Sequence, residues 1–290
     1  MASSRAKFAL GELKRDYERL RPGRESLLRL IAKAEVSEAV YNSNAIENST
    51  LTLDETERVL LAGEVSRDMD IREVLEAQNL ARITNYIVEK PVDLAVDGML
   101  LLHEMLLSNI DDEVAGRFRS DGEHVRVGSR VAPPPEAVAG MLTNAVADFH
   151  SDHEMYFLDR IARFHARFEN IHPFVDGNGR IGRVLANVQL IGFGFPPVIV
   201  RNSDKVAYYT ALREFDSRGT TSKMERLLSL ALLESLAKRV AHLSGGEIVK
   251  LSEYAKRNGQ SVHAVFNAAR RQTIRAFREH GHWRIAMPVS

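Results

Sequence analysis

Apolar residues recur at three- and four-residue spacing along most of the chain, which is the period of an amphipathic helix. The spacing is clearest in residues 27–31, 71–80 and 157–168, where leucine, isoleucine, valine and phenylalanine fall on one helical face. Two-residue alternation, which is typical of strands, is scarce, and its best example is residues 125–131. We therefore expect an all-α chain with one short β-hairpin.

Proline and glycine interrupt these helical patterns at three places. Pro91 closes a first helical region, Pro196-Pro197 interrupts the centre, and Ser244-Gly245-Gly246 has the composition of a hinge. The sequence therefore predicts three parts, an N-terminal helical region, a central helical domain and a last short segment, with the bounds 1–92, 93–243 and 247–290.

Composition narrows the class of protein. Hydrophobic residues make up 44% of the 290 residues, enough for a sizeable core, and the formal net charge is zero. A neutral chain has no overall electrostatic attraction to nucleic acid or membranes. The chain has no cysteine, which excludes disulfides, thiolate zinc sites and cysteine nucleophiles. With neither a signal-peptide pattern nor an apolar run of bilayer length, we expect a cytoplasmic protein without a membrane partner.

The chemistry concentrates in residues 172–183, which read HPFVDGNGRIGR between two predicted helices. The first helix is expected to end near Asn170, and Pro173 prevents it from continuing. The second helix begins around Gly179. Gly177 and Gly179 let a ligand approach the backbone closely, and the free amides at the start of the second helix form an anion site.

The side chains of the same loop supply the remaining parts of a transfer reaction. Arg180 and Arg183 present guanidinium groups suited to phosphate oxygens. Asp176 is a hard oxygen ligand of the kind that holds magnesium beside a phosphate. His172 can accept a proton near neutral pH. Together these residues predict phosphoryl or nucleotidyl transfer driven mainly by electrostatic stabilisation.

Two other interpretations of the loop are weaker. Residues 177–182 match the dinucleotide-binding pattern G-x-G-x-x-G, but that pattern needs a preceding strand within a βαβ unit. Here a helix precedes the loop, and alternating strands are missing. A plain turn with a structural histidine is the other interpretation, and the number of phosphate-binding features within twelve residues argues against it.

The loop resembles the signature of the Fic family, which is histidine-proline-phenylalanine, any residue, an acid, glycine-asparagine-glycine-arginine, two residues and arginine. Gly116–Arg119 with the 125–131 hairpin is similar to the target-binding flap of that family, and residues 208–212 are similar to its tyrosine pair near the nucleotide. The resemblance covers roughly residues 20–240 and implies a Fic-type helical bundle with a β-hairpin flap. One departure is Asp216, where related chains often carry asparagine.

This resemblance implies a protein adenylyltransferase, which moves AMP from ATP to a tyrosine, threonine or serine hydroxyl of a target protein, the enzyme itself included. His172 would deprotonate the hydroxyl, and Asp176 would hold Mg²⁺ against the phosphates. The residues implied to contact the nucleotide are Gly177, Asn178, Gly179, Arg180, Arg183, Tyr208 and Tyr209. For the two tyrosines, plain core packing is an equally good interpretation. The family often dimerises, which suggests a homodimer.

Residues 43–48, SNAIEN, resemble the inhibitory helix motif of the same family in its class II arrangement, N-terminal to the active loop. Asn48 tolerates the left-handed conformation that ends helices, which places Glu47 at a helix C-terminus. The helix dipole disfavours a carboxylate there, so Glu47 needs a cationic partner, and Arg183 is the candidate. Ser43 is expected to cap or hydrogen-bond Glu47. An exposed glutamate at a helix end is the alternative interpretation.

The last segment, residues 247–290, is basic, with eight lysines and arginines against three acids and a net charge of +5. Residues 251–258 are predicted to form a short helix, Gly259 a turn, and Ser261 the N-cap of a second helix. This pattern is similar to a small helix-turn-helix unit that binds DNA, although a solvated helical pair packed on the main domain fits equally well.

Three further activities stay open at this point. One is transfer of another nucleotide or a phosphate group on the same fold, and one is the reverse reaction, removal of AMP from a target. The third is a DNA-binding regulator whose helical body senses a nucleotide. The scattered histidines are expected to be structural; they are His103, His124, His150, His153 and His165.

Overall fold

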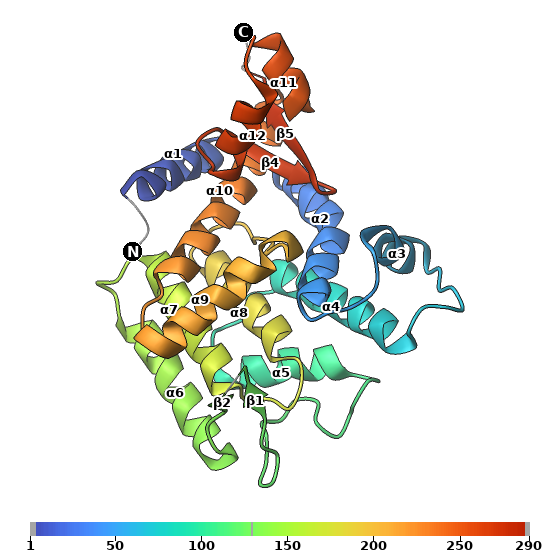
Figure 1. The fold of residues 1–290 in the computed structure, drawn as a ribbon, viewed down its shortest axis with the longest axis vertical. Coiled ribbons are helices and arrows are strands. Elements are labelled where there is room, and N and C mark those ends of the chain that lie inside the picture. Colours follow the sequence, from blue (N-terminus) through green and yellow to red (C-terminus); the bar gives the residue numbers. More distant parts are fainter. Residues whose placement is uncertain (1–3, 129, 288–290) are drawn as a thin grey trace. The chain divides into compact units, whose positions relative to one another are not determined.

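The computed structural model describes residues 4–128 and 130–287, and most of them are helical (Figure 1). This confirms the all-α class. The helices are α1 (Ser4–Leu20), α2 (Glu25–Ile46), α3 (Leu53–Glu57), the π-helical turn η1 (Arg58–Ala62), α4 (Ile71–Glu89), α5 (Val96–Leu107), α6 (Pro135–Ser151), α7 (Phe157–Ile171), α8 (Asn178–Gly192), the 3₁₀ turn η2 (Asn202–Asp204), α9 (Lys205–Arg218), α10 (Ser222–Ser244), α11 (Leu251–Arg257) and α12 (Val262–Arg270).

The predicted hairpin is present as β1 (Arg126–Val127) and β2 (Arg130–Val131), which pair antiparallel. A second sheet was not predicted. It contains β3 (Ile248–Lys250), β4 (Ala276–Glu279) and β5 (His282–Ala286), in the antiparallel order β3-β5-β4. The segment after residue 247 is therefore a helix-turn-helix with a three-stranded sheet, rather than a purely helical unit.

The described chain separates into two compact units. The first contains residues 36–195 and 199–225, and the second contains residues 4–35, 196–198 and 226–287. All the predicted catalytic, nucleotide-binding and inhibitory residues fall in the first unit. The three-part division expected from the sequence stays a prediction.

The core of the first unit is built around α7 and α8, the helices on either side of the predicted loop. Most of α7 is buried, and its buried apolar residues are Leu158, Ile161, Ala162, Phe164, Ala166, Phe168 and Ile171. The loop is anchored to this core by Phe174, whose side chain is fully buried. The loop is therefore held at both ends by packed helices and in its middle by a buried ring.

The second unit has its own small core beneath the three-stranded sheet. Its buried members are Val249, Leu251, Ala255, Val265, Ala269, Ala276 and Ile285. The two helices and the turn predicted in this segment are present, because α11 ends at Arg257 and α12 begins directly after Ser261. None of the described helices combines the length and the apolar character that a bilayer crossing requires.

Candidate active site

The loop between α7 and α8 keeps its shape through two backbone turns and one side chain. His172 ends α7 in the left-handed conformation with φ 51°, and Gly177 precedes α8 with φ 78°. The amide of Asn178 closes the loop, because its Oδ1 accepts from the Phe174 N–H at 2.9 Å and its Nδ2 donates to the Phe174 carbonyl at 2.9 Å. Asn178 therefore shapes the loop with its side chain and leaves its backbone N–H for a ligand.

The start of α8 has the properties of an anion site. The first amide of α8 that bonds backwards is that of Ile181, which donates to the Gly177 carbonyl at 3.0 Å. The N–H groups of residues 178–180 belong to the first turn, which has no acceptor inside its own helix, and no described side chain caps it. The Nε of Arg180 is buried and lacks a hydrogen-bond partner among the described residues. Phosphate oxygens would satisfy both sets of donors.

His172 is in the protonation state that a general base needs. Its Nδ1 lies 3.3 Å from the backbone carbonyl oxygen of Glu169. Because a carbonyl oxygen only accepts, Nδ1 carries the proton and Nε2 keeps its lone pair. Burial lowers the pKa of His172 below its ordinary value of 6.5, which keeps the ring neutral at pH 7.

Arg119 ties the segment before the hairpin to this histidine. Its Nε donates to the His172 carbonyl at 2.8 Å, and its backbone N–H donates to the Pro173 carbonyl at 2.9 Å. The side chain is buried. In the sequence Arg119 was noted only as part of the flap resemblance, whereas the structure makes it the connection between that segment and the active loop.

Asp176, the predicted metal ligand, lies at the edge of the anion site and is 41% exposed. Its Oδ1 accepts from the Gly177 N–H at 2.6 Å and lies 3.3 Å from an Arg180 nitrogen. Its Oδ2 accepts from Arg72 of α4 at 2.6 Å. Across the described residues, no group of three or more histidines, aspartates and glutamates is arranged to hold a metal. A single carboxylate together with substrate phosphates is nevertheless the usual way that proteins hold Mg²⁺, so Asp176 fits such an ion.

His103 of α5 contacts the loop through the Asp176 carbonyl and the Phe174 ring. Its Nδ1 accepts from the Gly116 N–H at 3.1 Å, so its Nε2 carries the proton and donates to the Asp176 carbonyl at 3.1 Å. Its ring stacks on Phe174 with 3.7 Å between centroids. Burial lowers the pKa of His103 to about 4, which keeps this tautomer neutral. His103 was expected to be structural, and the structure shows which part of the site it supports.

The pair predicted between Glu47 and Arg183 is present. Arg183 NH1 lies 2.8 Å from Glu47 Oε1, next to the first turn of α8. A Cβ built on Gly179 would overlap that carboxylate oxygen, which shows how closely Glu47 approaches the anion site. Because it lies at the N-terminus of α8, the carboxylate is stabilised by the dipole of this helix as well as by Arg183.

Ser43 makes a different contact from the one expected. Its hydroxyl accepts from Arg183 Nε at 3.0 Å, and its carbonyl accepts from Arg183 NH2 at 2.9 Å. Ser43 and Glu47 are four residues apart, so they face the same side and reach the same guanidinium. Ser43 therefore holds Arg183 in the position that Glu47 needs.

The two tyrosines have different environments. Tyr208 is fully buried, with its hydroxyl 2.8 Å from His165 Nε2 and its ring 5.7 Å from the Arg183 guanidinium carbon. Tyr209 is partly buried, and its hydroxyl lies 3.4 Å from Glu47 Oε2. Of the two interpretations left open by the sequence, core packing describes Tyr208 better.

Sequence reasoning missed a buried carboxylate behind the site. Glu169 of α7 lies with Oε1 3.3 Å from the Tyr208 hydroxyl, and burial raises its pKa to about 7. Arg183 is the cationic neighbour that opposes this rise in the pKa. No spacing in the sequence distinguishes Glu169 from the exposed acids of other helices, because its burial depends on packing between α7, α8 and α9.

The hairpin is attached to the site through Arg130. This side chain donates to the Asn170 carbonyl at 2.9 Å and lies 3.6 Å from Asp216 Oδ1 on α9. Asp216, the position that departs from the resemblance, therefore pairs with the hairpin. Val131 at the end of β2 is 61% exposed, which leaves apolar surface on the hairpin uncovered.

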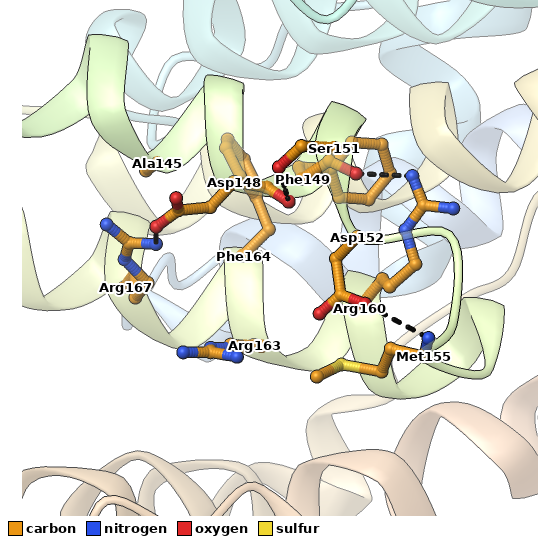
Figure 2. A pocket seen from close by; sticks show the side chains of 10 residues that line it. All are labelled: Ala145, Asp148, Phe149, Ser151, Asp152, Met155, Arg160, Arg163, Phe164 and Arg167. Atoms are coloured by element: carbon orange, nitrogen blue, oxygen red, sulfur yellow. Dashed lines mark hydrogen bonds and ion pairs between the residues drawn. The ribbon is translucent and has the colours of Figure 1, made fainter.

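A separate hollow of about 210 Å³ lies between α6 and α7 (Figure 2). It contains none of the predicted site residues. Its charged groups are largely paired: Arg167 contacts Asp148 at 2.5 Å, and Arg160 donates to the Phe149 carbonyl. We assign no function to this hollow.

Comparison with known proteins supports the interpretation of the loop. Residues 93–190 match the Fic/DOC family. The chain is 34% identical over 182 residues to the protein adenylyltransferase Fic of Nematostella vectensis, a match that covers 60% of this chain and 42% of that protein. It is also 34% identical over 181 residues to the protein adenylyltransferase fic-1 of Caenorhabditis elegans, covering 60% of this chain and 35% of the relative. The chain thus spans about two fifths of the length of these curated relatives.

Solved structures show the same fold. A Fic domain containing signaling protein from Bacteroides thetaiotaomicron has a TM-score of 0.72 and 25% identity, over 82% of this chain and 98% of the other. A Fic family protein from Desulfovibrio desulfuricans has a TM-score of 0.65 and 22% identity, over 97% of both chains. The second match extends the likeness of fold to the segment after residue 247.

Proposed function

Residues 93–190 of this chain form a Fic/DOC domain, and from this premise we propose that the protein is an adenylyltransferase that transfers AMP from ATP to a hydroxyl of a target protein. The shared name of the curated relatives supports the reaction. The observation that carries the proposal is the neutral His172, with Nε2 available, beside the uncapped start of α8.

The proposed reaction uses each part of the loop once. Nε2 of His172 takes the proton of the target hydroxyl, and the hydroxyl oxygen forms a bond to the α-phosphorus of ATP. The bond from that phosphorus to the bridging oxygen of the β-phosphate breaks, and pyrophosphate leaves. The amides of residues 178–180 and the Arg180 guanidinium stabilise the charge that develops on the phosphate oxygens.

Mg²⁺ belongs to the substrate in this proposal. Asp176 would hold it, and it would neutralise charge on the phosphates. The intact run Gly177-Asn178-Gly179-Arg180 favours nucleotidyl transfer over phosphotransfer, because the phosphotransferase variant of this fold is associated with an altered loop sequence.

Glu47 inhibits the enzyme in this proposal. Arg183 is needed for the terminal phosphates, and its contacts to Glu47 and Ser43 occupy the guanidinium. ATP then binds in an unproductive position. A water oriented by Glu47 would support the reverse reaction, removal of AMP from a target.

The target enters along the hairpin. An extended segment that adds as a strand to β1 or β2 would place its hydroxyl near His172, with backbone hydrogen bonds providing affinity. The hairpin is joined to the loop through Arg119 and Arg130, so a bound segment has a defined position relative to the base. The enzyme itself is a candidate target, and the homodimer stays a prediction.

Mass spectrometry of Glu47→Gly protein after incubation with each of the four nucleoside triphosphates tests the proposal. We expect a mass gain of one AMP with ATP and Mg²⁺, and no gain in the double variant Glu47→Gly/His172→Ala. A gain with another nucleotide would change the donor, and a single phosphate would change the reaction. No gain with any donor, with or without an added peptide pool, would contradict transferase activity.

A second function, DNA binding, is favoured by the strand order β3-β5-β4 around α11 and α12. This arrangement is a helix-turn-helix followed by a β-hairpin, and the N-terminal part of its second helix is exposed from Ser261 to Ala264, while Val265 and Ala269 face the core. In helix-turn-helix proteins the N-terminal residues of the second helix contact base edges.

The charges of this unit divide into paired and available groups. Arg257 contacts Glu247 and Glu253, whereas the exposed Arg270 and Arg271 make no ion pair within residues 247–287. We expect the full chain to bind duplex DNA with an affinity that falls as salt rises. In Arg270→Gln/Arg271→Gln, the slope of log affinity against log salt should fall by the equivalent of about two phosphate contacts. Arg257→Gln is the matched control and should change little. A salt-independent or undetectable interaction would contradict this function.

A further inference from the structure

The metal-facing side of the anion site is already occupied by a cation from the chain. Arg72, in the first turn of α4, donates through NH2 to Asp176 Oδ2 at 2.6 Å. The other carboxylate oxygen, Oδ1, accepts from the Gly177 N–H. Both oxygens of Asp176 are therefore engaged before any substrate binds.

The contact has the properties of one that is easily displaced. The side chains of Arg72 and Asp176 are 52% and 41% exposed. Ion pairs between exposed groups contribute little to stability, because water and salt screen them and the side chains lose freedom. A divalent cation held by phosphates and a carboxylate would outcompete such a pair.

Arg72 also has a second acceptor that keeps it near the site. Its Nε donates to Glu76 Oε1 at 3.1 Å, and the same oxygen lies 3.0 Å from an Arg180 nitrogen. If the guanidinium left Asp176, its contact with Glu76 would hold it beside the phosphate-binding arginine. The guanidinium of Arg72 is thus held by Glu76 through Nε, while its NH2 contact with Asp176 can be displaced.

The backbone of Arg72 is fixed, so only its side chain needs to move. The Arg72 N–H donates to the N-cap Asp70 at 2.8 Å. One residue further on, Glu73 accepts from the Thr50 N–H at 2.8 Å and the Leu51 N–H at 3.2 Å. These bonds secure the start of α4 to the segment that follows Glu47.

We propose that Arg72 is a cationic placeholder on Asp176, which the metal of the metal–nucleotide substrate must displace. This inference rests on the proposed function of the site. A guanidinium on Oδ2 covers one of the two oxygens with which Asp176 could hold a metal, and a cation held there repels an incoming dication. Arg72 therefore raises the metal concentration at which the site fills, independently of the Glu47–Arg183 pair.

Binding of Mn²⁺ in the presence of ATP, followed by electron paramagnetic resonance at low salt, tests the proposal. The full chain carries His172→Ala so that no transfer occurs during the titration. Adding Arg72→Gln, which keeps polar bulk and removes the charge, should tighten the apparent Mn²⁺ dissociation constant by about two- to fivefold. The control is Arg82→Gln on the same helix, whose guanidinium contacts Asn79 and a backbone carbonyl, and it should leave the constant unchanged.

Asp176→Asn separates the two ways in which this idea can fail. If Asp176→Asn abolishes Mn²⁺ binding while Arg72→Gln leaves it unchanged or weakens it, the metal site stands and the placeholder is wrong. If Asp176→Asn binds Mn²⁺ as tightly as the parent, then Asp176 is not the metal ligand, and both the placeholder and that part of the proposed function are wrong.

Discussion

Two ion pairs flank the first turn of α8, and they differ mainly in the burial of their arginines. On one side, the Arg183 side chain is 6% exposed and contacts Glu47, Ser43 and the Tyr208 ring, while Glu47 itself is 34% exposed. On the other side, Arg72 and Asp176 are about half exposed and share one short hydrogen bond. Both pairs join an arginine to a carboxylate, so the difference between them shows what burial of the arginine does to such a contact.

Burial makes the first pair hard to replace. If a buried arginine loses its carboxylate, its charge is left without a counter-ion in a place that water does not reach, which costs roughly 1–3 kcal/mol or more. Burial lowers the pKa of Arg183, but the charges of Glu47 and its other neighbours outweigh this effect and raise the pKa above its ordinary value. The exposed pair can exchange with solvent and ions at little cost. On the proposed function, the pair with the buried arginine would act as an inhibitor, and the exposed pair would act as a modulator.

The two pairs can influence transfer only if the turn between them is catalytic. In a Glu47→Gly background, His172→Ala should reduce AMP transfer at least about 100-fold, because a positioned general base contributes that much or more. Binding of ATP, measured by thermal shift, should persist, since the amides of α8 and the arginines remain. Transfer that survives in the double variant would remove His172 as the base.

Breaking the buried pair should produce the next largest effect. We expect Glu47→Gly to raise transfer about tenfold or more, because it frees Arg183 for the terminal phosphates. The free protein should lose about 1–3 kcal/mol of stability, since Arg183 keeps its Ser43 contacts but loses its carboxylate. ATP should then raise the melting temperature more in Glu47→Gly than in the parent.

Glu64→Gly, at an exposed glutamate of the same region, is the control for the loss of a side chain. Its activity and its response to ATP should match those of the parent. If Glu47→Gly is as inactive as the parent while its ATP response increases, the pair limits binding but does not control transfer.

A carboxylate with a raised pKa, Glu169, lies near Arg183, so pH should affect the stability of this side of the site. The pKa of Glu169 is raised to about 7 by burial, against the charge of Arg183 and with the nearby Glu47 contributing. A raised pKa favours the protonated form in the folded state. Its contribution to stability is therefore fully present below pH 4.5 and is lost as pH rises through 7, by up to about 3 kcal/mol.

Glu169→Gln stays neutral at every pH and should not show this loss. Urea titration at several pH values gives the free energy of unfolding of both proteins. The value for Glu169→Gln minus the value for the parent should increase between pH 4.5 and 7. The histidines with lowered pKa values, His103, His165 and His172, titrate in both proteins and cancel in the difference. A difference that does not vary with pH would show that Glu169 is ionised throughout.

The sequence predicted the buried pair and not the exposed one, and the reason is physical. The loop chemistry is contiguous, and its flanking helices have one strongly apolar face, so residues 172–183 could be placed between two helices without tertiary information. Glu47 was paired with Arg183 because its helix end needed a cation and because a family motif covers it. Arg72 and Asp176 are 104 positions apart, and no local pattern connects them.

The second sheet was missed for a related reason. β3, β4 and β5 have three to five residues each, too few to show a two-residue alternation. Their pairing depends on contacts such as Val249 with Ile285, across the intervening helices α11 and α12. Short strands are stabilised by their partners rather than by their own sequence, whereas α11 and α12 carry local start and stop signals.

Of these changes, raising the salt concentration should alter the measured ratios least, but it should distinguish the two pairs most clearly. The Debye length falls from about 10 Å at 0.1 M to about 3 Å at 1 M salt, which screens exposed charges far more than buried ones. We expect the ratio of transfer rates between Glu47→Gln and the parent to stay constant from 0.05 to 0.5 M KCl. The ratio of metal half-saturation between Arg72→Gln and the parent, about two to five at low salt, should approach one over the same range. If both ratios fall together, the guanidinium of Arg183 is as accessible to solvent ions as that of Arg72, and burial does not distinguish the two contacts.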